Sequence, residues 1–114
     1  MWVRVCPVAQ LPVGQAMEFR GIGIFHTEEG WFAIDNQCPH FDAQLHLGDI
    51  HEGKVYCPWH QWRFHLKTGQ CDLGSRFDIA AFPVMEKDGY LWVAPEEGRR
   101  LEREAEDDDD GFVF

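Results

Sequence analysis

Basic side chains are scarce in this sequence, which holds ten Lys and Arg against twenty Asp and Glu and carries a formal net charge of −10. No cluster of Lys and Arg offsets that charge, so the chain repels phosphate groups. We therefore exclude nucleic acids and anionic membrane surfaces as partners. A partner protein with a basic surface fits the charge better.

Long apolar runs are also absent, because no segment approaches the roughly 18 consecutive apolar residues of a membrane-spanning helix. The first residues, MWVRVCPVAQLPVGQ, show neither a basic leader followed by an apolar run nor a small-residue cleavage pattern. We therefore expect a soluble protein of the cytoplasm. In that compartment disulfides are rare, and cysteine thiolates are available to metals.

Helical periodicity is the third scarce feature. Short runs rich in β-forming residues recur instead, at residues 2–6, 16–20, 22–27 and 31–35. Near the end, two apolar runs flank Lys87, Asp88 and Gly89, and Asp-Gly supplies the positive φ that a tight hairpin turn requires. Glycines also punctuate the whole length. The sequence therefore predicts a mainly β fold, an antiparallel sandwich or barrel.

The length of 114 residues leaves room for one domain of ordinary size, and 45% hydrophobic residues provide a core for it. After Pro95 the composition changes to EEGRRLEREAEDDDD. We assign residues 1–95 to the folded domain and residues 96–114 to an acidic C-terminal tail. A short helix over Arg99 to Glu106 is expected within that tail, ended by the self-repulsion of the four-Asp run.

The densest chemistry lies in CPHFDAQLHLGDIHEGKVYCPWHQW, residues 38–62, which sets C-x-H and C-x-x-H on either side of a gap of sixteen residues. Each pair lies between strand-like segments, so we expect two loops that converge on one site. Structural zinc usually pairs like with like, as C-x₂₋₄-C and H-x₃₋₅-H. A [2Fe-2S] cluster with two thiolates on one iron and two imidazoles on the other needs one Cys and one His from each loop. The alternation favours the iron-sulfur cluster, and zinc remains the alternative.

This motif closely resembles the Rieske iron-sulfur signature, and the similarity extends from about Trp2 to Ala94. It implies a Rieske-type β fold with two cluster-binding loops and one [2Fe-2S] cofactor. The resemblance assigns Cys38 and Cys57 to one iron, and His40 and His60 to the other. The following CPWHQWRFHLKTGQC is similar to bacterial Rieske ferredoxins and to the small Rieske-like subunit of NAD(P)H nitrite reductase, except that Gln61 replaces a common Gly.

Two features of the resemblance imply the low-potential class of the family. The respiratory type carries a disulfide beside the cluster, and the matching positions here are Ala43 and Trp59. It also places a Ser hydroxyl against a bridging sulfide where this chain has Trp62. Because hydrogen bonds to cluster sulfur stabilise the added electron, their loss lowers the reduction potential.

The function implied is one-electron transport, because a cluster with four protein ligands offers no open position for a substrate. We expect a ferredoxin that takes electrons from a flavin reductase and delivers them to a terminal oxygenase. The alternative is the small subunit of an assimilatory nitrite reductase, bound to its large subunit. A structural zinc module is the second alternative. The chain is not expected to catalyse a reaction alone.

The remaining Cys and His are predicted to be structural or exposed. Cys6 and Cys71 form no C-x-x-C pair, so we expect small thiols packed in or near the core. The four other histidines are interpreted as surface residues, with His46 the best candidate for a further role because it follows the first motif. The aromatic residues beside the motif are expected to exclude water from the cluster; these are Phe41, Trp59, Trp62 and Phe64.

Overall fold

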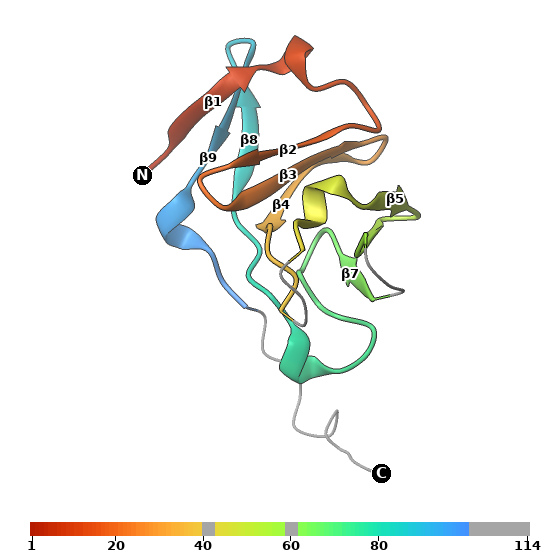
Figure 1. Cartoon of the computed structure of the whole chain (residues 1–114). Helices are drawn as coiled ribbons and strands as arrows, with labels where there is room; N and C mark the ends of the chain where they lie inside the picture. The colour runs from red at the N-terminus through yellow and green to blue at the C-terminus, as the bar shows by residue number, and fades with distance from the viewer. Residues whose placement is uncertain (40–42, 59–61, 101–114) are drawn as a thin grey trace.

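The computed structural model describes residues 1–39, 43–58 and 62–100. Within these ranges, nine strands form three antiparallel sheets of three strands each (Figure 1). The first sheet has the order β1-β9-β8, with β1 at Val3–Pro7, β9 at Tyr90–Val93 and β8 at Val84–Lys87. The second is β2-β3-β4, at Ala16–Phe19, Ile22–Thr27 and Gly30–Asp35. The third is β5-β6-β7, at Asp49–His51, Lys54–Tyr56 and Arg63–His65.

These sheets confirm the predicted fold class. The predicted runs at 16–20, 22–27 and 31–35 correspond to β2, β3 and β4 within one residue at each end. Four short 3-10 helices interrupt the described chain, η1 at Val8–Gln10, η2 at Leu45–Leu47, η3 at Ser75–Phe77 and η4 at Pro95–Glu97. In the described part of the chain the sheets pack in layers and do not close into a barrel.

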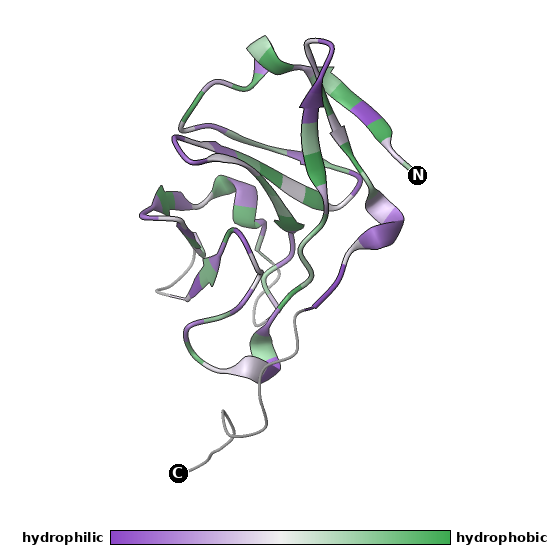
Figure 2. Cartoon of the chain, turned by 180° about the vertical axis from the view of Figure 1, so that it is seen from behind, coloured by the Kyte–Doolittle hydropathy of each residue, from purple (hydrophilic) through white to green (hydrophobic). Residues whose placement is uncertain are grey.

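Strand β3 is buried on both faces because its sheet lies between the other two sheets. Along β3, Ile22 and Ile24 pack into one hydrophobic core with Leu91 and Val93 of β9, whereas Phe25 packs into the other core. A strand with two buried faces needs a near-continuous apolar run, which is what IGIF provides. Figure 2 shows the resulting hydrophobic stretches on these strands and the hydrophilic turns between them.

Three hairpins of the described chain use the same two-residue turn. Asp88 and Gly89 have φ of 57° and 79°, as the sequence predicts for the β8-β9 hairpin. Arg20-Gly21 and Glu52-Gly53 adopt the same pair of positive φ values between β2 and β3 and between β5 and β6. Two successive positive φ values match the right-handed twist of the paired strands, which keeps these strands in register.

The segment after Pro95 begins against the folded body. Arg99 exchanges two backbone hydrogen bonds of 2.9 Å with Ala81, and the N-terminal ammonium group lies 2.9 Å from Glu96. The boundary at residue 95 stays a prediction. The expected helix over Arg99 to Glu106 does not begin at Arg99, because Arg99 forms an isolated β-bridge with Ala81, and its positions from 101 onward lie outside the described residues. No helix in the described ranges is long and apolar enough to cross a membrane.

Candidate metal centre

Two loops with the same hydrogen-bonded base carry the predicted ligands. In the first loop, the N–H of Cys38 donates to the carbonyl oxygen of Ala43 over 2.9 Å. In the second, the N–H of Cys57 donates to the carbonyl oxygen of Trp62 over 2.8 Å. Each loop therefore begins at a Cys-Pro pair and closes onto the residue five positions later. The sequence predicts two loops but not this shared closure.

Different elements support the two loops. The second loop connects β6 to β7, whose residues Tyr56 and Arg63 face each other in the ladder. The first leads from β4 to η2, and its ends meet at an isolated bridge between Gln37 and Gln44. The close packing of η2 on β6 needs a glycine, because a Cβ atom at Gly48 would lie 1.9 Å from the carbonyl oxygen of Tyr56. This contact holds the segment after the first loop against the strand that leads into the second.

The structure brings Cys38 and Cys57 into one buried cluster. Their exposed fractions are 1% and 3%, and both belong to the hydrophobic core that includes Val55 and Phe64. His40 and His60 lie outside the described residues, as do Phe41, Trp59 and Gln61. The assignment of all four ligands therefore stays a prediction.

This arrangement fits an iron-sulfur cluster on the chemistry of its described donors. Two thiols from separate loops share an apolar setting that excludes water, and thiolate is the soft ligand that iron-sulfur clusters select. Each loop also contains one histidine in the sequence, which supplies the two imidazoles of a Rieske-type donor set. Among the described residues alone, no group of three or more His, Cys, Asp or Glu could hold a metal ion.

The comparison with protein families agrees with the donor set. Residues 1–83 match the family model described as the Rieske [2Fe-2S] domain. The chain belongs to this family. Its cofactor is accordingly one Rieske-type [2Fe-2S] cluster, and its role is that of an electron carrier.

Curated relatives of this Rieske domain include a ferredoxin subunit and a much longer oxygenase. The 3-phenylpropionate/cinnamic acid dioxygenase ferredoxin subunit of Photorhabdus laumondii is 33% identical over 98 residues, which cover 82% of this chain and 93% of the relative. Chlorophyllide a oxygenase of Chlamydomonas reinhardtii is 34% identical over 100 residues, which cover 79% of this chain. The chain spans 16% of the length of that oxygenase.

Solved structures give the same picture of the fold. The ferredoxin of carbazole 1,9a-dioxygenase from Nocardioides aromaticivorans superposes with a TM-score of 0.72 at 29% identity, covering 82% of this chain and 96% of that one. The NMR structure of NirD from E. coli superposes with a TM-score of 0.73 at 25% identity, covering 82% and 94%. Both similarities confirm a mainly β Rieske fold.

The structure describes two of the three positions at which the chain differs from the respiratory type, namely Ala43 and Trp62. Ala43, at one of the two positions of the respiratory disulfide, is buried with 2% exposed. Trp62, at the position of the respiratory Ser, packs its ring edge-on against Phe77 with 4.5 Å between centroids. An indole in this contact has no hydroxyl to donate to a cluster sulfur.

A third segment, residues 69–79, packs against the second loop. The N–H of Cys71 donates to Oδ1 of Asp78 over 2.8 Å, and Cys71 forms an isolated bridge with Phe64 of β7. Cys71 is fully buried, and this burial raises the pKa of its thiol. The prediction of thiols in or near the core is thus confirmed for Cys71, and also for Cys6, which is half-buried against the core of Leu91 and Val93 with Sγ 3.8 Å from the Met17 sulfur. Nothing in the sequence predicts that the carboxyl group of Asp78 is buried.

The four histidines outside the two ligand positions have distinct surroundings. His26 stacks on Trp31 with 3.6 Å between ring centroids, and its Nδ1 lies 2.6 Å from the carbonyl oxygen of Leu11. His51 is exposed on β5, which fits the surface prediction. His65 and His46 lie in polar networks, and only the latter contacts the base of a ligand loop.

Asp72 gathers three cationic or imidazole groups on the outer face of β6 and β7. Its carboxylate lies 2.9 Å from Nζ of Lys54, 3.1 Å from Nε of Arg63 and 2.8 Å from Nε2 of His65. Partial burial would raise the pKa of Asp72, but these hydrogen bonds outweigh it and lower the pKa to about 2. The network ties the segment after Cys71 to the hairpin that bears the second loop.

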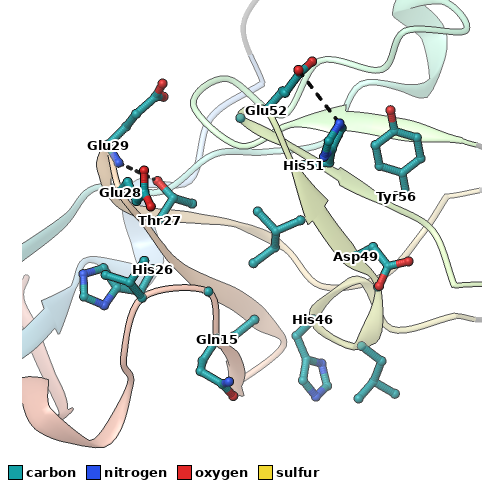
Figure 3. A pocket seen from close by; sticks show the side chains of 17 residues that line it. Gln15, His26, Thr27, Glu28, Glu29, His46, Asp49, His51, Glu52 and Tyr56 are labelled. Carbon is teal, nitrogen blue, oxygen red and sulfur yellow. Dashed lines mark hydrogen bonds and ion pairs between the residues drawn. The ribbon is translucent and has the colours of Figure 1, made fainter.

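A cleft of about 1050 Å³ lies between the β3-β4 turn and the β5-β6 hairpin (Figure 3). Its walls carry carboxylates, histidines and apolar side chains, and none of its lining residues is Lys or Arg. One lining residue, His46, also contacts Asn36, two residues before the first ligand loop.

Proposed function

We propose that this Rieske protein is a ferredoxin that carries single electrons from a flavin reductase to a terminal oxygenase. In this proposal Cys38 and Cys57 bind one iron of the cluster, while His40 and His60 bind the other. The cluster supplies reversible one-electron chemistry. The chain holds it in an apolar core between two loops of equal length.

One observation favours a ferredoxin over an oxygenase. The chain spans 93% of a dioxygenase ferredoxin subunit but 16% of a chlorophyllide oxygenase. An oxygenase needs a second domain for its mononuclear iron, which takes two His and a carboxylate. Residues 1–83 match the Rieske model, which describes the electron-transfer domain. In this proposal a partner protein supplies the catalytic iron.

The similarity to NirD favours a second candidate, the small subunit of a nitrite reductase. In that case the chain would be bound permanently to a large subunit. Gel filtration of a native lysate separates the two candidates, because a ferredoxin elutes near its own mass of 13.3 kDa. Elution of all the protein in a stable complex with a much larger chain would favour the subunit.

The experiment that tests the cofactor assignment is spectroscopy on the purified chain. A Rieske centre gives a brown protein that contains about two irons per chain. On reduction we expect an electron paramagnetic resonance signal with a low average g. A colourless protein that holds zinc would contradict both candidates.

A reconstituted electron-transfer assay then tests the carrier role. The oxidised chain is mixed with a flavin reductase, NADH and a terminal oxygenase, and product is measured with and without the chain. We expect turnover to depend on the chain in a saturable manner. Equal turnover in its absence would contradict the carrier role.

A further inference from the structure

Asn36 lies two residues before Cys38, and its side chain is buried, with 4% of the residue exposed. In the described ranges Asn36 and Asp78 are the only buried residues with polar or charged side chains. A buried amide loses its hydrogen bonds to water, so it persists where the protein supplies partners of its own.

The side chain and the carbonyl oxygen of Asn36 form hydrogen bonds with residues just beyond the first ligand loop. Its Oδ1 accepts the N–H of His46 over 2.8 Å, and its Nδ2 lies 2.9 Å from Nδ1 of that ring. Because Nδ2 can only donate, Nδ1 of His46 accepts in this contact, whereas in the tautomer with a proton on Nδ1 the ring donates to Oδ1 of Asn36, 3.1 Å away. The carbonyl oxygen of Asn36 accepts the N–H of Leu45 over 2.6 Å. Nδ2 also donates to Oε1 of Gln44 over 3.4 Å. One residue therefore connects the start of the loop to its end by four hydrogen bonds.

Asn36 is itself fixed on the central sheet. Its N–H donates to the carbonyl oxygen of Gly21 over 3.0 Å. The side chain also lies directly over β3, because a Cβ atom at Gly23 would be 2.8 Å from its Oδ1. The loop is thus attached to a strand that is buried on both faces.

The second ligand loop does not need such a residue. Two positions before Cys57 lies Val55, which is fully buried and apolar. The β6-β7 ladder pairs the residues on either side of that loop, Tyr56 with Arg63. No corresponding ladder joins β4 to η2 in the described chain, so the side chain of Asn36 replaces strand pairing at the base of the first loop.

From this geometry we propose that Asn36 is the positioning residue for the Cys38 loop, acting through Leu45 and His46. The inference rests on the ligand set of the proposed function. Asn36 touches neither iron nor ligand in this account. It fixes the direction from which Cys38 approaches, and so governs how long the cluster is retained and the symmetry of its environment.

The test compares Asn36→Leu with two other variants of the full chain. Leu keeps the volume of Asn but removes its side-chain hydrogen bonds. We expect loss of the cluster to chelator, followed by visible absorption, to become about tenfold faster, as for other residues that orient metal ligands. The g values of the reduced protein should also shift. Asn36→Asp retains acceptors for the N–H of His46 and for a ring N–H, so it should restore most of the wild-type rate.

Ile24→Ala is the control for general destabilisation, because Ile24 is fully buried in the other hydrophobic core. We expect it to lower the melting temperature without shifting the g values. If this control loses its cluster as fast as Asn36→Leu at an equal melting temperature, the positioning role is wrong. Should Asn36→Leu not fold, His46→Phe removes the Nδ1 partner alone, and an unchanged release rate and spectrum in that variant would equally overturn the proposal.

Hydrogen exchange measured on the iron-free chain tests the role of Asn36 independently of the proposed function. Asn36→Leu should speed exchange of the Cys38 and Leu45 amides relative to amides of β3. Unchanged exchange at both positions contradicts the positioning role of Asn36 even when the wild type binds its cluster. If the wild type binds no cluster but exchange is still faster in Asn36→Leu than in the wild type, the ligand assignment is wrong and the positioning role of Asn36 stands.

Discussion

Cys57 donates its backbone N–H to the carbonyl oxygen of Trp62 over 2.8 Å, and this bond joins the two ends of the second ligand loop. The same closure joins Cys38 to Ala43 in the first loop. Two stretches of chain that differ in sequence therefore hold their cysteines at the start of loops closed in the same way. The hydrophobic core around Val55 and Phe64 then brings the two cysteines into one cluster.

Replacing a proposed ligand should abolish the visible absorption. For Cys57→Ser and for His60→Ala we expect iron content to fall from about two per chain to near zero, because the cluster needs all four ligands. His51→Ala is the matched control, since His51 is an exposed histidine on β5. Iron analysis and absorption spectra provide the measurement. An intact spectrum in His60→Ala would exclude His60 as a ligand.

The reduction potential should lie in the lower half of the span of about −150 to +300 mV seen for Rieske clusters, because the respiratory disulfide and Ser are absent. Trp62→Ser should raise the potential, since a hydroxyl at this position donates to cluster sulfur in the respiratory type. Trp62→Ala is the control, because it removes the same contact with Phe77 without adding a donor. Voltammetry on both variants distinguishes the hydroxyl from the loss of the indole. Equal potentials for Ser and Ala would argue against a hydrogen bond at this position.

Asp72 should make stability depend on acid pH. Its pKa is about 2 in the folded chain, below the ordinary value of 3.8, so folding is favoured by the ionised form. This contribution is present above about pH 4 and is lost as the pH falls through 2. After allowance for solvent screening at a partly exposed site, Asp72→Asn should cost about 1 kcal/mol at pH 7.

Urea unfolding of wild type and Asp72→Asn across pH 2 to 7 checks this effect. The difference between the two free energies of unfolding should shrink below pH 4. Asp49→Asn serves as a control on an exposed carboxylate of β5. A difference that stays constant down to pH 2 would show that Asp72 contributes through packing and not through charge.

Removal of residues 101–114 should slow association with a basic redox partner. These residues carry seven carboxylates and one Arg, so the truncated chain has a net charge of about −4. The truncation leaves the contact of Arg99 with Ala81 in place. Because steering by charge is screened by salt, the loss should be largest at low ionic strength. Stopped-flow rates that do not change with truncation at any salt concentration would assign the tail no role in steering.

Much of the fold could be predicted from local patterns. Strand β3 begins with the apolar run IGIF, and Asp88-Gly89 is a strong turn signal, so the sequence predicts both at their observed places. The Arg20-Gly21 and Glu52-Gly53 turns are not predicted, although they have the same backbone conformation. Arg and Glu adopt positive φ less readily than Asp, so these turns depend on the pairing of their flanking strands rather than on the residues in them.

The sequence by itself determined the alternation of strands and turns and the choice of cluster, since both depend on residue type and spacing over a few positions. Only the tertiary structure decided which side chains support the cysteine-bearing loops. Asn36, Asp72 and Asp78 look like ordinary polar residues in the sequence. They acquire their roles because packing removes water from them or brings distant donors to them, and a polar group's energy depends on the partners that remain.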